Sequence, residues 1–143
     1  MQIRLMTDND MDSVIDIWLA ASKEAHHFIP QEYWESKEKD MRTVYLPMAD
    51  TYVLEDGAGT VGFISTVQHA LAALFVHPRE QGKGYGRALL QSVKERSPKL
   101  ELKVYKENEN AFRFYSRHGF TVVEETVDED TGHAEYVMAW GER

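Results

Sequence analysis

The sequence contains no cysteine among its 143 residues. Disulfide bonds, thiolate nucleophiles and zinc–thiolate sites are therefore excluded. The chain also lacks an apolar run long enough to span a bilayer, and its N-terminus lacks the basic, apolar and small-residue order of a secretory signal. We expect a cytoplasmic protein that does not associate with membranes.

Basic residues are also scarce, since 16 lysines and arginines face 24 aspartates and glutamates and leave a formal net charge of −8. Nucleic-acid binding depends on neutralising phosphates with basic side chains, so we expect no nucleic-acid partner. An acidic surface favours a cationic ligand such as an amine, although acidity also simply keeps a protein in solution. The length predicts a single domain over residues 1–143 and leaves both a monomer and a homodimer open.

The hydrophobic pattern predicts an α/β (α+β) fold in the order β-α-α-β-β-β-α-β-α-β-β. Strands are expected at 2–5, 51–55, 60–66, 70–76, 100–105, 121–127 and 133–140, with a hairpin turn at 56–59. Helices are expected at 7–19, 31–45, 86–93 and 108–118. The continuous apolar run 70–76 is typical of a strand buried on both faces. Hairpins on either side of one β-α-β crossover then give a mixed sheet with helices on both faces.

A glycine-rich segment, QGKGYG at 81–86, lies between the expected buried strand and the following helix. Glycines there allow positive φ and a close approach of a ligand to the backbone. The unpaired N–H groups and the dipole at the helix start favour an anion such as a pyrophosphate, and Lys83 and Arg87 add positive charge. The spacing matches neither a P-loop nor a Rossmann fingerprint. A tight turn that binds no ligand is the alternative.

A second segment, NENAFRFYSRHGF at 108–120, predicts a well-capped amphipathic helix. Asn108 is a good N-cap, and Gly119 suits the left-handed position that ends a helix. One face of this helix carries Ala111, Phe114, Tyr115 and His118. Taken alone, such a face is an ordinary aromatic stripe packed into a core.

Together, the two segments resemble the GNAT superfamily of N-acetyltransferases. The first is similar to the superfamily's cofactor loop, Arg/Gln-x-x-Gly-x-Gly/Ala, and matches it at Gln81, Gly84 and Gly86. The second is similar to its Asn-x-x-Ala-x-x-Phe-Tyr-x-x-x-Gly-Phe helix and matches it at Asn108, Ala111, Phe114, Tyr115, Gly119 and Phe120. The element order extends the resemblance over essentially the whole chain and implies a GNAT-like fold of about seven strands and four helices.

The resemblance implies an enzyme that moves an acetyl group from acetyl-CoA, as cosubstrate, to a primary amine by direct attack on the thioester. The acetyl-CoA would lie where strands 70–76 and 100–105 splay apart. Tyr115 would protonate the departing sulfur as general acid, because a phenol stays protonated at neutral pH. The residues implied to hold the cofactor are Leu74, Phe75, Val76, Gln81, Gly82, Lys83, Gly84, Tyr85, Gly86, Arg87, Asn108, Ala111 and Phe114.

The general base has several candidates. Members of this superfamily that use a direct base often carry a carboxylate on the central strands, and the strand 70–76 has none. Histidine has a suitable ordinary pKa, which makes His69, His26 and His27 candidates; Glu24 is a weaker one, and a water chain is a further alternative. His26 and His27 lack a third ligand at metal spacing, so we expect no metal site.

The segment from Ser22 to Trp34 resembles a subgroup of small bacterial members that includes proteins assigned to protein lysine acetylation. The acceptor would then be a protein lysine, a protein N-terminus or a small amine. Aromatic candidates for its binding wall are Phe28, Tyr33, Trp34, Tyr45 and Phe63. Acidic candidates for attracting it are Glu124, Glu125 and residues 128–130.

Two other classes of function stay open at this point. A non-catalytic acyl-CoA sensor would keep the glycine loop without turnover, although the presence of Tyr115 argues against it. A protein-interaction domain without a ligand has no need of three unobstructed glycines in that loop.

Overall fold

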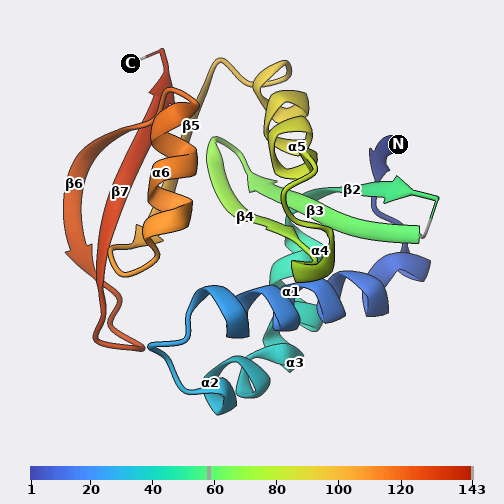
Figure 1. Ribbon diagram of the computed structural model, residues 1–143, viewed down its shortest axis with the longest axis horizontal. Coiled ribbons are helices and arrows are strands. Elements are labelled where there is room, and N and C mark those ends of the chain that lie inside the picture. Colours follow the sequence, from blue (N-terminus) through green and yellow to red (C-terminus); the bar gives the residue numbers. More distant parts are fainter. Residues whose placement is uncertain (58, 143) are drawn as a thin grey trace.

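The computed structural model describes residues 1–57 and 59–142, so Ala58 in the expected hairpin turn lies outside the described residues. These residues form a seven-stranded sheet in the order β1-β2-β3-β4-β5-β7-β6 (Figure 1). The strands are β1 (Gln2–Leu5), β2 (Asp50–Asp56), β3 (Gly59–Val67), β4 (Ala70–Val76), β5 (Lys99–Tyr105), β6 (Thr121–Val127) and β7 (Ala134–Gly141). The predicted element order and mixed sheet are confirmed.

Three helices agree in position with the prediction. They are α1 (Met11–Ala25), preceded by a 3₁₀ turn at Asp8–Asp10, α5 (Tyr85–Lys94) and α6 (Glu109–Arg117). The expected end of α1 at residue 19 was too early, because the helix continues to Ala25. Ser22 explains the extension, since this polar residue is fully buried and its carbonyl accepts the His26 N–H. None of the helices in the described ranges is long and apolar enough to cross a membrane.

The expected single helix over 31–45 is wrong, because the chain there forms a series of short pieces. They are α2 (Gln31–Ser36), α3 (Glu38–Asp40), a π-helical turn at Met41–Tyr45 and α4 (Leu46–Met48). Met41 and Leu46 are both buried although they lie five residues apart, and the Leu46 N–H bonds the Met41 carbonyl. A wide i→i+5 turn places such residues on one face, which a regular α-helix does not.

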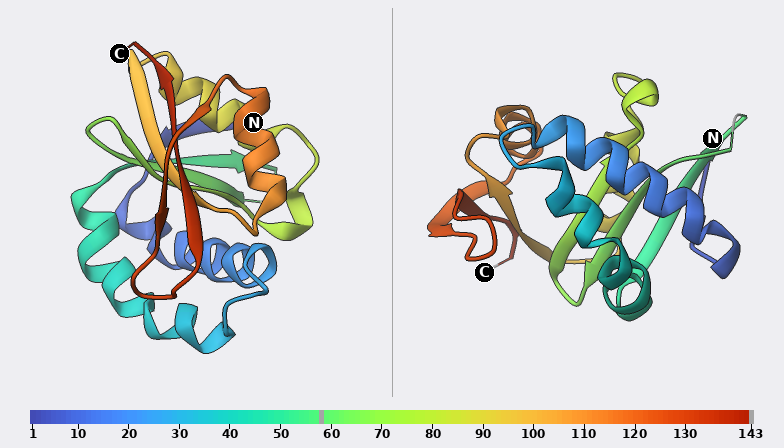
Figure 2. Two further views of the ribbon diagram at one scale, coloured as in Figure 1. Left: turned by 90° about the vertical axis from the view of Figure 1, so that its left-hand side faces the viewer. Right: turned by 90° about the horizontal axis from the view of Figure 1, so that it is seen from below.

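Helices cover both faces of the sheet, as predicted. In the right-hand view of Figure 2, α1 and the segment from α2 to α4 lie in front of the strands. Trp18, Trp34, Met41 and Leu46 belong to the core on this side, together with Val53, Phe63 and Ala73 of the sheet. The other core lies under α5 and α6 and contains Leu89, Leu90, Val93 and Tyr115 with Leu71, Leu100, Leu102 and Val104. The sheet therefore separates two apolar layers, which meet different helices.

The two central strands, β4 and β5, run parallel and pair only where they begin. Ala70 is paired with Glu101, whereas all other neighbouring strands in the sheet are antiparallel. Ser65 pairs with Ala73 but Thr66 pairs with Leu71, so Ala72 is an extra residue of β4. Such a β-bulge bends its strand and increases the local twist. β4 consequently diverges from β5 beyond the bulge, as Figure 1 shows.

The expectation that β4 is buried on both faces is wrong at its start. Ala70 and Ala72 are exposed, while Leu71 and Ala73 are buried. Alanine side chains are too short to fill the space beside the strand, and Ala72 lines a cavity described below. Apolar composition alone does not distinguish a covered strand from one that borders a hollow.

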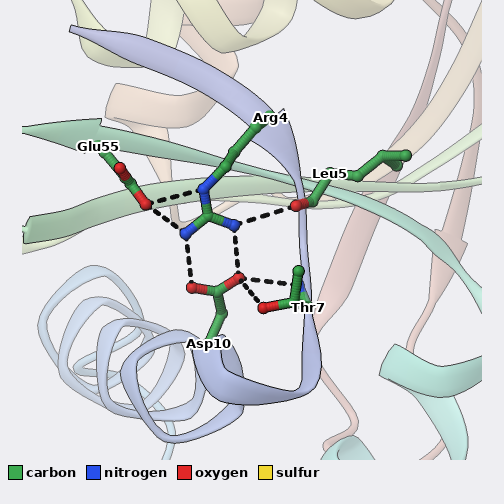
Figure 3. A network of polar contacts seen from close by, with 5 residues as sticks. All are labelled: Arg4, Leu5, Thr7, Asp10 and Glu55. Carbon is green, nitrogen blue, oxygen red and sulfur yellow. Dashed lines mark hydrogen bonds and ion pairs between the residues drawn. The ribbon is translucent and has the colours of Figure 1, made fainter.

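A polar network fixes the start of α1 to the edge of the sheet (Figure 3). The Arg4 guanidinium donates to both carboxylate oxygens of Asp10, at 2.7 and 2.8 Å, and also bonds Glu55 of β2. Asp10 accepts the Thr7 N–H at 2.8 Å, which forms part of a capping box at the start of the helix. The bond from Arg4 holds the pKa of the buried Asp10 carboxyl down at about 2.

Candidate active site

A cavity of about 770 Å³ occupies the place where β4 and β5 diverge. Its walls come from the end of β4, the glycine-rich segment before α5, the first turns of α6 and the end of α1. The predicted cofactor residues that line it are Leu74, Phe75, Val76, Gln81, Gly82, Gly84, Tyr85, Gly86, Arg87, Asn108, Ala111 and Phe114. Of the predicted set, Lys83 alone is absent from this wall, and its ammonium is paired with Glu80.

The backbone of β4 offers an open edge to this cavity. Residues 74–76 keep antiparallel pairing with Ile64, Phe63 and Gly62 of β3 on one side. On the other side β5 has turned away, because its pairing with β4 is confined to Ala70 and Glu101. Backbone N–H and C=O groups at such an edge are ready to pair with an extended ligand. The side-chain amide of Gln81 already donates to the Val76 carbonyl at 3.1 Å.

The glycine loop leaves the start of α5 unobstructed. Gly82 and Gly84 have φ of +81° and +85°, a conformation that favours glycine, and a Cβ at either position would meet nothing within 4 Å. Gly84 is the N-cap of α5, so the first N–H groups of that helix face the open side. Backbone donors, the helix dipole and Arg87 together suit a phosphate group.

Asn108 joins α6 to the end of α1. Its side-chain oxygen caps α6 by accepting the Ala111 N–H at 3.2 Å, as the sequence predicts. Its amide nitrogen therefore faces the other way and lies 3.2 Å from Nε2 of His26. Because an amide nitrogen only donates, His26 Nε2 must accept, and the ring proton is then on Nδ1. The geometry fixes the neutral tautomer of His26.

Burial sets the protonation of His26. Its side chain lies stacked on Trp34, with ring centroids 5.1 Å apart, and meets the edges of Phe28 and Tyr105. Only 8% of the residue is exposed, and Nδ1 is buried without a partner among the described residues. Desolvation lowers the pKa of His26 to about 4. A neutral imidazole with its accepting nitrogen already bonded is a poor proton acceptor.

The other two histidine candidates are exposed and lie at different ends of β4. His27 is exposed and lines the 770 Å³ cavity beside Glu24. His69 is exposed in the turn before β4, and its carbonyl accepts the Glu101 N–H. The cavity uses the opposite end of β4, about 15 Å farther along the strand, so the structure does not bring His69 to the site. Among the described residues, no group of three potential metal ligands is found.

Tyr115 lies on the face of α6 that borders the cavity. It is 9% exposed, its ring packs against Phe114 and Phe120, and its burial raises the pKa of the phenol well above its usual range. Within the described ranges, no hydrogen-bond partner is found for its hydroxyl, which leaves the proton available to a ligand.

A second cavity, of about 470 Å³, lies between the sheet and the α1–α4 layer. Phe75 lines both cavities, so the two meet at β4. Of the aromatic candidates, Tyr33, Trp34 and Tyr45 line this second cavity, whereas Phe63 is fully buried core and Phe28 packs against His26. Of the acidic candidates, Asp130 lines it from the turn between β6 and β7.

Sequence reasoning missed several residues of the second cavity, including Lys37, Met48 and Ser65. Lys37 stands on the broken helical segment, and its ammonium lies 3.3 Å from Asp130 Oδ2, a residue 93 positions away. No local pattern indicates that pair. The signal in the sequence was a lysine after the first turns of the helical segment and an acidic turn at 128–130. The two can be paired only when the strand order is known.

Sequence comparisons agree with this geometry. A family model described as an acetyltransferase (GNAT) domain matches residues 47–122. The protein named peptidyl-lysine N-acetyltransferase YiaC of Escherichia coli (strain K12) is 33% identical over 139 residues, which cover 96% of this chain and 95% of that protein. The protein named peptidyl-lysine N-acetyltransferase YjaB of the same strain is 29% identical, over 91% of this chain and 88% of that protein.

Solved structures agree in fold. The apo form of YjaB from Escherichia coli is 28% identical and has a TM-score of 0.86 over 97% of this chain and 96% of that chain. The PaiA N-acetyltransferase of Thermoplasma acidophilum, solved in complex with coenzyme A, has a TM-score of 0.81 over 99% of this chain and 100% of that chain. Its identity is 20%, so that likeness shows the fold alone.

Proposed function

This chain belongs to the GNAT family of acetyltransferases and is an acetyl-CoA-dependent N-acetyltransferase, and we propose that its acceptor is the side-chain amine of a protein lysine. The observation that carries the proposal is the meeting of two cavities at Phe75, one suited to a phosphate-bearing donor and one lined by aromatic rings and a carboxylate. The peptidyl-lysine activity in the names of two relatives supports the choice of lysine.

The residues of the larger cavity fit acetyl-CoA. The open edge at 74–76 suits the amide groups of the pantetheine arm, which pair with it as a neighbouring strand would. The N–H groups around Gly82 and Gly84 and the side chain of Arg87 suit the pyrophosphate. Lys83 does not line the cavity, and its ammonium is paired with Glu80. The bound cosubstrate supplies an acetyl thioester, an acyl group with a good leaving group.

Tyr115 provides the proton for the leaving sulfur. In the reaction the amine nitrogen forms a bond to the acetyl carbon, the carbon–sulfur bond breaks, and one proton reaches the sulfur as one leaves the nitrogen. Burial keeps the Tyr115 phenol protonated at neutral pH, which is the form that a general acid requires. No side chain forms a covalent intermediate, in agreement with a chain without cysteine.

His26 acts by positioning and not as the base. Its accepting nitrogen is bonded to Asn108, and its lowered pKa makes it a weaker base than an ordinary histidine. The bond instead joins His26, which lines the smaller cavity, to Asn108, which lines the larger one, and so fixes the first turn of α6. The ammonium of the acceptor loses its proton to water in that open cavity, the water route that the sequence left open. His27 and His69 have no part in this scheme.

The test begins with calorimetric titration of the purified protein with acetyl-CoA and with free CoA. We expect micromolar binding of both, followed by acetylation of lysine-containing peptides measured as CoA release. Binding of neither would contradict the assignment of the larger cavity. Binding without transfer to any amine would favour the sensor alternative, which the family relationship does not favour.

Several expectations from the sequence stay predictions. They are a single domain over residues 1–143, a cytoplasmic location, no nucleic-acid or membrane partner, and a monomer or homodimer in solution.

A further inference from the structure

One ammonium group of the protein already occupies the smaller cavity. Nζ of Lys37 lies 3.3 Å from Asp130 Oδ2 and 5.5 Å from the centroid of the Tyr33 ring. The Tyr33 hydroxyl donates to the same carboxylate oxygen at 3.4 Å. Of the described residues that line this cavity, Lys37 carries the one full positive charge and Asp130 the one negative charge. A carboxylate beside an aromatic ring face is a suitable environment for an alkylammonium group.

The two partners differ in how firmly they are held. Asp130 stands in a turn built by hydrogen bonds: its N–H donates to Asp128 Oδ1 at 3.0 Å, and the Tyr105 hydroxyl donates to Asp128. Lys37 contributes its charge through a flexible four-carbon stem. Ion pairs with exposed partners add little stability, and the side chain of Asp130 is 61% exposed. An external cation can therefore displace Lys37 while Asp130 and Tyr33 stay in place.

This carboxylate is unsuited to the nitrogen that is acetylated. The attacking amine must be neutral, whereas an ammonium group paired with a carboxylate holds its proton more tightly. Asp130 also comes from the β6–β7 turn, while β4 borders the cavity through Ala72, Ala73 and Phe75. The cavity thus separates a place for the reacting nitrogen, beside β4, from a place for a positive charge.

We propose that Asp130 and Tyr33 bind a second cationic group of the acceptor, which displaces Lys37 when the acceptor enters. The acceptor class is then a primary amine with another positive charge within reach, either a lysine next to a basic residue or a small diamine. Lys37 acts as an internal competitor for the same carboxylate, so an acceptor gains the contact with Asp130 only by displacing Lys37. This inference rests on the proposed function, because it assigns the acceptor side of the same reaction.

Matched substrates that differ by one charge test the proposal. The first pair is a single-lysine peptide flanked by arginine and the same peptide flanked by citrulline, its neutral isostere. The second pair is 1,5-diaminopentane and n-pentylamine. We expect the wild type to prefer the more highly charged member of at least one pair by about three- to tenfold in kcat/KM. The pair that shows the preference identifies the acceptor as a basic peptide or as a small diamine.

Three variants complete the experiment. Asp130→Asn should abolish the preference, and Lys37→Gln should lower KM for the doubly charged substrate while leaving KM for its neutral-flanked partner nearly unchanged. Glu129→Gln, at an exposed neighbouring residue outside the described cavity wall, should keep the wild-type preference. A preference of equal size in Asp130→Asn, or no preference in the wild type for either pair, would overturn the proposal.

A binding measurement separates this proposal from the proposed function. Calorimetric titration with 1,5-diaminopentane, compared with 1-pentanol, needs no turnover. Binding of the diamine that Asp130→Asn weakens, in a protein that acetylates no amine, would refute the proposed function and support the cation site. Acetylation of both substrate pairs at rates that Asp130→Asn does not alter would support the proposed function and refute the cation site.

Discussion

The two cavities are built from different kinds of structure. The larger one is formed mainly by short local segments of the chain, which are the open edge of β4, the glycine loop and the capped start of α6. The smaller one is formed by side chains from α1, the broken segment α2–α4, β3, β4 and the β6–β7 turn. Under the proposed function, acetyl-CoA would be bound by segments that are local in sequence, whereas the acceptor would be recognised by residues that are distant in sequence.

The largest effect is expected from Tyr115, whose side chain is the proposed proton donor in the larger cavity. Tyr115→Phe should lower kcat by about 10²- to 10³-fold, because the sulfur loses its proton donor. The dissociation constant for acetyl-CoA should change little, since the binding groups proposed here are the edge of β4, the glycine loop and the side chain of Arg87. Initial rates and calorimetry on the same preparation separate the two effects. An unchanged kcat would remove Tyr115 from the mechanism.

His26 probes the acceptor side through pH. Its pKa is about 4 in the folded protein and about 6.5 when unfolded, so the unfolded chain binds more protons between these values. The stability contributed above pH 6.5 is then lost as the pH falls towards 4, by about 2 to 3 kcal/mol. His26→Gln should lose less stability over that window in denaturant titrations, and the exposed control His27→Gln should behave as wild type.

The kinetic pH profile gives the second readout for His26. If His26 only positions Asn108, His26→Gln lowers kcat without removing any limb of the rate profile between pH 6 and 9. Disappearance of a limb with an apparent pKa near 7 would instead identify His26 as the base.

Gly84 tests the backbone character of the larger cavity. Gly84→Ala places a Cβ at a φ of +85°, which costs about 1 to 2 kcal/mol for an L-residue. The substituted loop should relax to another conformation and should have to regain the strained one to bind acetyl-CoA. This cost should weaken acetyl-CoA binding by about tenfold. Gly132→Ala carries a similar strain at φ +75°, in the β6–β7 turn, and serves as the matched control. Equal loss of acetyl-CoA affinity in both variants would show a global effect.

Asp10 lies outside both cavities and should affect stability alone. Asp10→Asn removes a carboxylate whose pKa is lowered to about 2 by Arg4, and should cost about 1 to 2 kcal/mol at neutral pH. The carboxylate's contribution is complete above its unfolded pKa near 4 and disappears as the pH falls through 2, so the two proteins should converge in acid. Thermal unfolding checks this, with Asp8→Asn, an exposed residue of the same turn, as the control.

The sequence predicts well whatever depends on neighbouring residues. The capping role of Asn108 and the seven strands follow from local propensities, and the structure agrees. The single helix expected over 31–45 is wrong because burying both Met41 and Leu46 requires a π-helical turn. Tertiary packing here overrides the local preference for a regular α-helix. The bulge at Ala72 likewise has no signal in an apolar run.

The candidate site divides in the same way. Twelve of the predicted cofactor residues line one cavity because two motifs in adjacent elements converge on the splayed strands. The histidine candidates rest on an ordinary pKa and on an approximate place in the chain, beside the strand 70–76 or between the first two helices. Neither indicates that His26 is buried or that His69 lies at the end of β4 away from the larger cavity. Lys37 and Asp130 meet only once the sheet has brought the β6–β7 turn to the broken helical segment.

The position of Phe75, shared by both cavities, has a consequence for the order of events in turnover. Under the proposed function, the donor would lie in the larger cavity and the acceptor in the smaller one, so neither would occupy the other's site. Either substrate would then be able to bind first, and both would be bound together when the acetyl group moves. Double-reciprocal plots of initial velocity at varied concentrations of the two substrates should show intersecting lines. Neither substrate should be required to bind first.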